Sequence, residues 1–135
     1  YFNNKYIPRA GYSKNTTELN YENNYRYIRY ADVLLMAAEA NNRGGISDSK
    51  AQSYLNQVRS RAGVSAINET GSALTQAIWD ERRLEFAGEG HRFFDLVRTG
   101  QAANEISGFV AGKHEVFPIP QTEIDISGLT QNPGY

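Results

Sequence analysis

The sequence predicts a mainly α-helical protein, built from helical hairpins and completed by an irregular, loop-rich region and short extended segments at the C-terminus. Apolar residues recur with a helical period between about residues 28 and 99. Glycines separate the periodic stretches, as expected at helix ends. Asparagine, glycine and proline interrupt any such period before residue 27, and the period is lost after residue 100.

Composition restricts the possible partners and chemistry. Lysine and arginine number 14 against 15 acidic residues, so the net charge of −1 argues against a nucleic-acid partner, which needs a basic face. The chain has no cysteine, which excludes disulfides and thiolate metal sites within it, and two histidines alone do not make a zinc site. We therefore expect no cofactor and no metal. Because the chain starts in mid-pattern without methionine, we interpret it as part of a longer protein.

The N-terminal stretch, residues 1–26, is predicted to be loop because asparagine, glycine and proline break every helical period. It is rich in tyrosine and asparagine. Tyrosine rings stack on sugar rings and asparagine amides bond hydroxyl groups, so this stretch is a candidate ligand platform. The candidate contacts are Tyr12, Tyr21 and Tyr25. An ordinary surface loop is the alternative.

Two helices are expected next, over about residues 28–41 and from a cap at Ser47 or Asp48 to about Ala62. The first is apolar almost all round, which predicts burial on several sides. The second has a clean amphipathic stripe. Their length and small-residue spacing predict a loose tetratricopeptide-type hairpin, with an ordinary antiparallel helix pair as the alternative.

A third helix is expected over about residues 72–87, with Thr70 or Ser72 as its cap, and a fourth over about 91–99. At ~100° per residue, the third helix places these side chains on one face: Leu74, Ala77, Ile78, Glu81, Leu84 and Glu85. Trp79 and the pair Phe93 and Phe94 are expected to be packing aromatics. In residues 101–135 we expect two short strands around Gly112 or one irregular extended run, then extended FPIP and a turn at QNPGY.

Charged residues on apolar helix faces predict a structural polar network. Its expected members are Asp32, Glu39, Arg59, Arg61, Glu81, Arg82, Glu85, Arg92, Asp95 and Arg98. An arginine fork satisfies a carboxylate and keeps it ionised, the wrong state for a general acid. We therefore expect no enzyme and no catalytic residue. The alternative is a hydrolase using Glu81 and Glu85, which loss of turnover in a Glu81→Gln variant would support.

Five blocks carry a resemblance to a known family: YIRYADVLLMAAEA, AQSYLNQVRSRAG, AIWDERRLEFAGEGHRFFDLVRTG, VFPIP and QNPGY. In this order, over about residues 27–135, they resemble the carboxy-terminal part of the SusD/RagB family. The resemblance implies tetratricopeptide-like helix pairs under a loop-rich ligand region. It divides the chain into the loop region 1–26, a helical scaffold over 27–100 and an extended tail over 101–135, with the upstream part missing.

The resemblance also implies a function. Members are surface lipoproteins of the bacterial outer membrane that bind oligosaccharides or other nutrients and deliver them to a SusC-like TonB-dependent transporter. They are not enzymes. Their lipid anchor is an upstream cysteine, which this chain lacks. The alternative is a helical-repeat protein-interaction module that binds no glycan.

Overall fold

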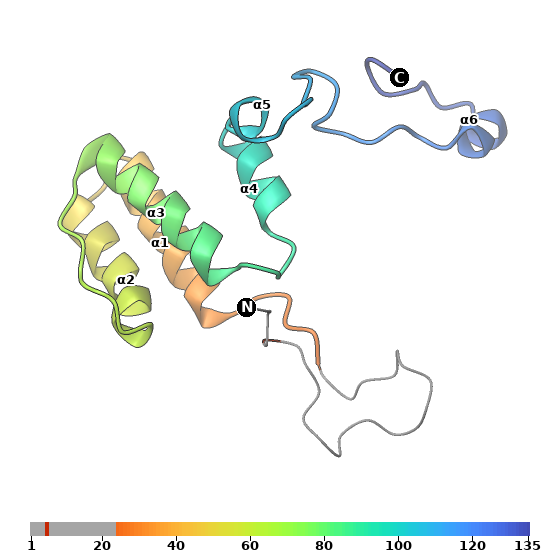
Figure 1. Ribbon diagram of the computed structural model, residues 1–135. Helices are drawn as coiled ribbons and strands as arrows, with labels where there is room; N and C mark the ends of the chain where they lie inside the picture. The colour runs from red at the N-terminus through yellow and green to blue at the C-terminus, as the bar shows by residue number, and fades with distance from the viewer. Residues whose placement is uncertain (1–4, 6–23) are drawn as a thin grey trace, which may run out of the picture. The chain divides into compact units, whose positions relative to one another are not determined.

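The computed structural model describes residue 5 and residues 24–135, in which the regular elements are all α-helices and no strand forms (Figure 1). The chain divides into two compact units, residues 1–90 and 91–135. None of the helices within the described part of the chain is long and apolar enough to cross a bilayer.

In the described residues of the first unit there are three helices: α1 (Tyr30–Arg43), α2 (Asp48–Arg61) and α3 (Gly71–Glu85). Helix α1 lies against both α2 and α3, and α1 with α2 forms an antiparallel hairpin (Figure 1). The mainly helical fold with tetratricopeptide-like pairs is therefore confirmed. Its helix ends lie within two residues of the predicted ones.

The core of this unit forms where the three helices meet. Leu35, Leu55, Leu74 and Ile78 are fully enclosed, and Ala38 and Ala51 let α1 and α2 approach closely. These residues come from the apolar stripes that predict the helices. Alternation of large and small side chains across the contact fills the space between the helices.

Helix α1 is not buried on several sides within this unit, contrary to the expectation from its all-round apolar sequence. Tyr30, Val33 and Met36, spaced three apart, remain exposed. Among the described helices of this unit, α2 and α3 pack against α1, and contacts on two sides leave its third side uncovered by them.

Polar side chains fix the starts of α2 and α3. The Ser47 hydroxyl accepts a hydrogen bond of 3.2 Å from the amide of Lys50, which confirms the cap of α2. Thr70 is the N-cap of α3, but its side chain makes no capping bond. Asp48 takes over that role, because its Oδ2 accepts the amide of Gly71 at 2.7 Å. The second helix thus caps the third.

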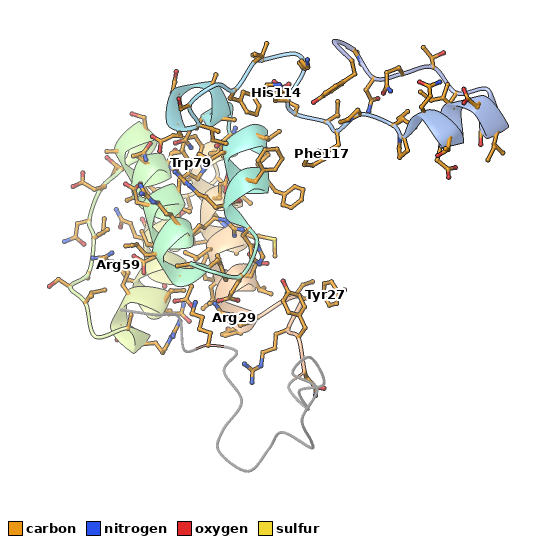
Figure 2. The ribbon with its side chains drawn as sticks, turned by 45° about the vertical axis from the view of Figure 1, so that its right-hand side comes forward. Tyr27, Arg29, Arg59, Trp79, His114 and Phe117 are labelled. Carbon is orange, nitrogen blue, oxygen red and sulfur yellow. The ribbon has the colours of Figure 1, made fainter. Side chains whose placement is uncertain are left out.

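The apolar face predicted for α3 is wrong at its last turn. Leu84 is 69% exposed, whereas Arg82 is buried. The reason lies on the neighbouring helix, where Asp32 accepts a hydrogen bond of 2.7 Å from the Arg82 guanidinium. Trp79 is half-buried on the same helix, with the Arg43 guanidinium 5.6 Å from its ring centroid (Figure 2).

The second unit contains α4 (Arg92–Arg98), α5 (Ala102–Glu105) and α6 (Gln121–Ser127). The last two helices were not expected, and neither the two short strands nor the single extended run expected around Gly112 forms in this unit. Turns replace them, because the carbonyl of Val110 accepts the amides of both Lys113 and His114. The C-terminal turn is confirmed: the amide of Tyr135 donates to Asn132, and Gly134 has the positive φ of 85° that a type II turn requires.

Candidate ligand-binding corner at the start of α1

A charged corner forms where the segment before α1 meets residues 85–89, here called the 85–89 turn. Arg29 holds this turn with both edges of its guanidinium. Its Nε and Nη2 donate to the two carboxylate oxygens of Glu89, each at 2.8 Å, and its Nη1 donates to Glu85 at 2.7 Å. The same guanidinium lies 5.0 Å from the ring centroid of Phe86. Arg29 is therefore fixed in position by ionic, hydrogen-bonding and aromatic contacts together.

Two residues from the N-terminal stretch reach the same turn. The Lys5 ammonium lies 2.6 Å from a carboxylate oxygen of Glu89 and also donates to the backbone carbonyl of Glu85. The Tyr25 hydroxyl donates to the backbone carbonyl of Glu89 at 3.0 Å. Lys5 and Tyr25 are 20 positions apart, yet both bind the residue at the end of this turn.

The backbone of the turn explains why Glu89 is held here. Gly88 and Gly90 flank it with φ of 78° and 82°, a conformation that side chains other than glycine rarely adopt. Between them the Glu89 side chain points inward and is only 2% exposed. A buried carboxylate needs counter-charges, and Arg29 and Lys5 supply them.

The charges of the corner reinforce one another. Burial raises the pKa of Glu89, but hydrogen bonds and attraction from Arg29 and Lys5 outweigh it, so the pKa lies below its ordinary value. Burial likewise raises the pKa of Glu85, and Arg61 and Arg29 reverse that effect and lower it. The hydrogen bond to Glu89 is the main cause that raises the pKa of Arg29. Both carboxylates therefore stay ionised at neutral pH.

Acidification is expected to destabilise this corner. Because the pKa values of Glu85 and Glu89 are lower in the folded chain than in the unfolded one, their stabilising contribution is complete above the ordinary value of 4.5. This contribution is lost as the pH falls through the lower pKa values that the two carboxyl groups have in the folded chain. We expect the melting temperature of the parent to decrease from pH 5 to pH 3. In a Glu89→Gln variant we expect a smaller decrease over the same range. Equal falls in both proteins would contradict the assignment.

A pair of exposed tyrosines lies beside this corner. Tyr25 and Tyr27 pack edge to face with ring centroids 5.1 Å apart, and they are 55% and 83% exposed. Figure 2 shows Tyr27 and Arg29 close together at the start of α1. Because the hydroxyl of Tyr25 is bonded to the 85–89 turn, its ring is held while part of its surface faces solvent. The predicted candidates Tyr12 and Tyr21 lie outside the described residues.

A groove of about 850 Å³ runs between α1 and α2 from the same corner. Its apolar lining comes from Tyr30, Ala31, Leu34 and Val58. The side chain of Asn56 is already bonded to the backbone of Ile67. Its Nδ2 donates to the Ile67 carbonyl at 2.9 Å, and its Oδ1 accepts a hydrogen bond from the Ile67 amide at 2.8 Å. Polar groups of the groove are thus partly occupied within the fold.

The residues of the predicted polar network form ion pairs, and Glu85 links one of these pairs to Arg29 at the corner. Within the first unit, Arg59 lies 2.6 Å from Glu81, Arg61 lies 2.5 Å from Glu85, Arg82 lies 2.7 Å from Asp32 and Glu39 lies 2.8 Å from Arg43. In the second unit, Arg98 lies 2.7 Å from Asp95, and Arg92 lies 3.2 Å from Glu105. No cluster of three or more potential metal ligands occurs in residues 24–135 or at Lys5.

Arg29, Glu89 and Lys5 were not predicted as functional or network residues. A glutamate between two glycines just after a helix was the available signal for Glu89, because such a turn can direct a side chain inward. For Arg29 and Lys5 the sequence carries no comparable signal.

Comparisons with known proteins identify the family. The family model described as the SusD family matches residues 1–135. The chain is 33% identical to the SusD-like protein P2 of Formosa agariphila, over 97% of this chain and 30% of that protein. It therefore spans less than a third of the length of this relative.

Solved structures give the same result. A SusD homolog from Bacteroides thetaiotaomicron matches with a TM-score of 0.74 and 38% identity, over 78% of this chain and 24% of that one. Surface glycan-binding protein A from Bacteroides uniformis matches with a TM-score of 0.69 and 40% identity, over 84% of this chain and 28% of that one. With a family model matched along all 135 residues and the same fold in these relatives, the chain belongs to the SusD family.

Proposed function

We propose that the full-length protein binds an oligosaccharide nutrient at the surface of the bacterial cell and delivers it to a SusC-like TonB-dependent transporter. The observation that carries this proposal is the match of the SusD family model to residues 1–135. The likeness to a surface glycan-binding protein, at 40% identity, supports a carbohydrate as the ligand. The transporter partnership rests on the resemblance to the family alone.

The proposed location is the outer membrane, with the protein exposed at the surface and anchored by a lipid on an upstream cysteine. This follows from the family, to which the chain belongs by its match over residues 1–135. Anchoring near the transporter would keep captured ligand close to its route of entry and raise its effective concentration there.

The proposed mechanism is binding and release, with no bond chemistry. Arginine pairs hold Glu81 and Glu85, at 2.6 Å from Arg59 and 2.5 Å from Arg61. For Glu85, Arg61 and Arg29 hold the pKa of the carboxyl below its ordinary value, so this group stays ionised and is a poor proton donor. The acidic side chains therefore support the framework of a carrier.

The proposed ligand contacts are Tyr12, Tyr21 and Tyr25. Among them, Tyr25 is described, and its exposed ring beside Tyr27 is suited to stack on a sugar ring. A stacking face costs less to bind when it is already held, and the hydroxyl of Tyr25 is bonded to the 85–89 turn at 3.0 Å.

Glycan-array binding with the full-length protein tests the function directly. We expect a defined set of oligosaccharides to bind, and the affinity for the best of them, measured by calorimetry, to fall about tenfold in a Tyr25→Ala variant. A Tyr135→Ala variant, which removes a tyrosine of the second unit, serves as the matched control and is expected to bind as the parent does. A full-length protein that binds no glycan on the array would contradict the proposal.

A further inference from the structure

We infer that Glu89 is the positioning residue for the tyrosine pair Tyr25 and Tyr27, holding both rings in place through contacts at either end of the N-terminal stretch. The inference rests on the proposed function for its ligand, but the positioning itself is a property of the described residues. Nothing in the sequence pattern assigns Glu89 to a ligand site.

The first step is that Glu89 binds the chain on both sides of Tyr27. Its carbonyl accepts the hydroxyl of Tyr25 at 3.0 Å, and its carboxylate accepts two bonds of 2.8 Å from Arg29. Tyr27 lies between these two residues in the sequence and packs edge to face on Tyr25. The backbone that carries the pair is therefore fixed before and after Tyr27.

The second step is that Lys5 binds the same carboxylate. Its ammonium lies 2.6 Å from Glu89 Oε1, the oxygen that also accepts Arg29 Nη2. One buried carboxylate thus holds two cations from different parts of the N-terminal region. Removing its charge would leave both cations without this partner.

The third step separates Glu89 from Glu85, the other carboxylate of the turn. Glu85 shares Arg29, but its second ion-pair partner is Arg61 on α2. Loss of the Glu85 charge therefore weakens the attachment of α2 and leaves the bonds from Lys5 to Glu89 and from Tyr25 to Glu89 in place. Removing the charge of Glu85 and removing the charge of Glu89 are therefore expected to have different local effects.

Trypsin offers a local measurement that needs no ligand. Arg26 is exposed and lies between the two tyrosines, so cleavage after it requires this segment to detach from the 85–89 turn. Lys113 belongs to the second unit, and cleavage after it reports opening elsewhere in the chain. The ratio of the two rates in the full-length protein separates local release from general unfolding.

We expect a Glu89→Gln variant of the full-length protein to be cleaved after Arg26 at least about tenfold faster than the parent, with the rate after Lys113 unchanged. A Tyr25→Phe variant removes only the hydroxyl bond and is expected to show a smaller increase at the same site. If Glu89→Gln does not fold, this second variant carries the test alone.

A Glu85→Gln variant is the matched control, because it neutralises the other acid of the same turn. We expect its rate of cleavage after Arg26 to rise less than in Glu89→Gln. A Glu89→Gln rate equal to the parent rate, or equal to that of Glu85→Gln, would overturn the inference. So would a parallel increase after Lys113, and so would an unchanged rate in Tyr25→Phe if that variant alone can be measured.

A second experiment measures binding of the oligosaccharide that the parent protein binds most tightly on the array. Its affinity is expected to fall about fivefold or more in Glu89→Gln, because a released tyrosine pair must be ordered again on binding. If the parent binds no oligosaccharide, the proposed function fails while the trypsin result still decides the positioning. If cleavage accelerates and affinity stays at the parent value, the positioning holds but its role in binding is refuted.

Discussion

Replacing Arg82 by methionine is expected to lower the free energy of unfolding by about 3–5 kcal/mol. Arg82 is buried on α3 and its guanidinium lies 2.7 Å from the buried carboxylate of Asp32 on α1. Methionine fills a similar volume but leaves the carboxylate in the core without its counter-charge. The loss would be measured by urea unfolding of the variant and the parent, whose unfolding free energies are expected to fall with urea concentration at the same slope.

The matched control is Arg83→Met, the same substitution at the next position of the same helix. Arg83 is exposed, so its change is expected to be within about 0.5 kcal/mol. An Asp32→Leu/Arg82→Met double variant removes both charges and is expected to recover most of the lost stability. Equal stability of the Arg82→Met and Arg83→Met variants would refute the buried pair.

Leu55→Ala is expected to cost about 2–5 kcal/mol of unfolding free energy. Leu55 on α2 is 0% exposed and lies in the core where the three helices of the first unit meet. The substitution removes apolar contacts and leaves a cavity that the surrounding helices only partly close. Calorimetric melting and urea unfolding would both report the loss.

Leu84→Ala is the matched control for this prediction, and it also tests where the structure departs from the sequence. Its helical position predicts a buried leucine, but the side chain is 69% exposed. We expect a change within about 0.5 kcal/mol. A loss as large as that of Leu55→Ala would show that Leu84 is covered in the full-length protein.

The helices of the first unit were predictable because their signals are local. Apolar stripes and helix-ending glycines set α1, α2 and α3 to within two residues. The failure at Leu84 has a tertiary cause, since the bond between Arg82 and Asp32 joins residues 50 positions apart. A period along one helix does not contain that information.

The second unit was harder to predict for a different reason. Helix α5 has only 4 residues, too few for a hydrophobic period to develop, and the apolar residues of α6, Ile124 and Ile126, are spaced two apart and do not follow a helical period. The valine and phenylalanine residues around Gly112 favoured strands by their propensity. The structure uses turns there, and strand propensity is easily overridden by context.

The candidate site was predicted only in part, and the part that was missed depends on long-range pairing. Tyr25 could be selected from residue type, because exposed tyrosines suit sugar rings. Arg29 meets Glu89 across 60 positions of sequence, and Lys5 meets it across 84. Sequence spacing specifies which faces of a helix are apolar, but it does not specify which arginine reaches which acid.

Trp79 gives the chain a built-in spectroscopic reporter. It is the one tryptophan among the 135 residues, its indole nitrogen is enclosed, and the cation of Arg43 on α1 lies 5.6 Å from its ring centroid. Its fluorescence emission should therefore shift to longer wavelength when α1 and α3 separate and water reaches the ring. In a full-length protein whose other tryptophans are replaced by phenylalanine, that shift would follow the opening of this helix pair in real time.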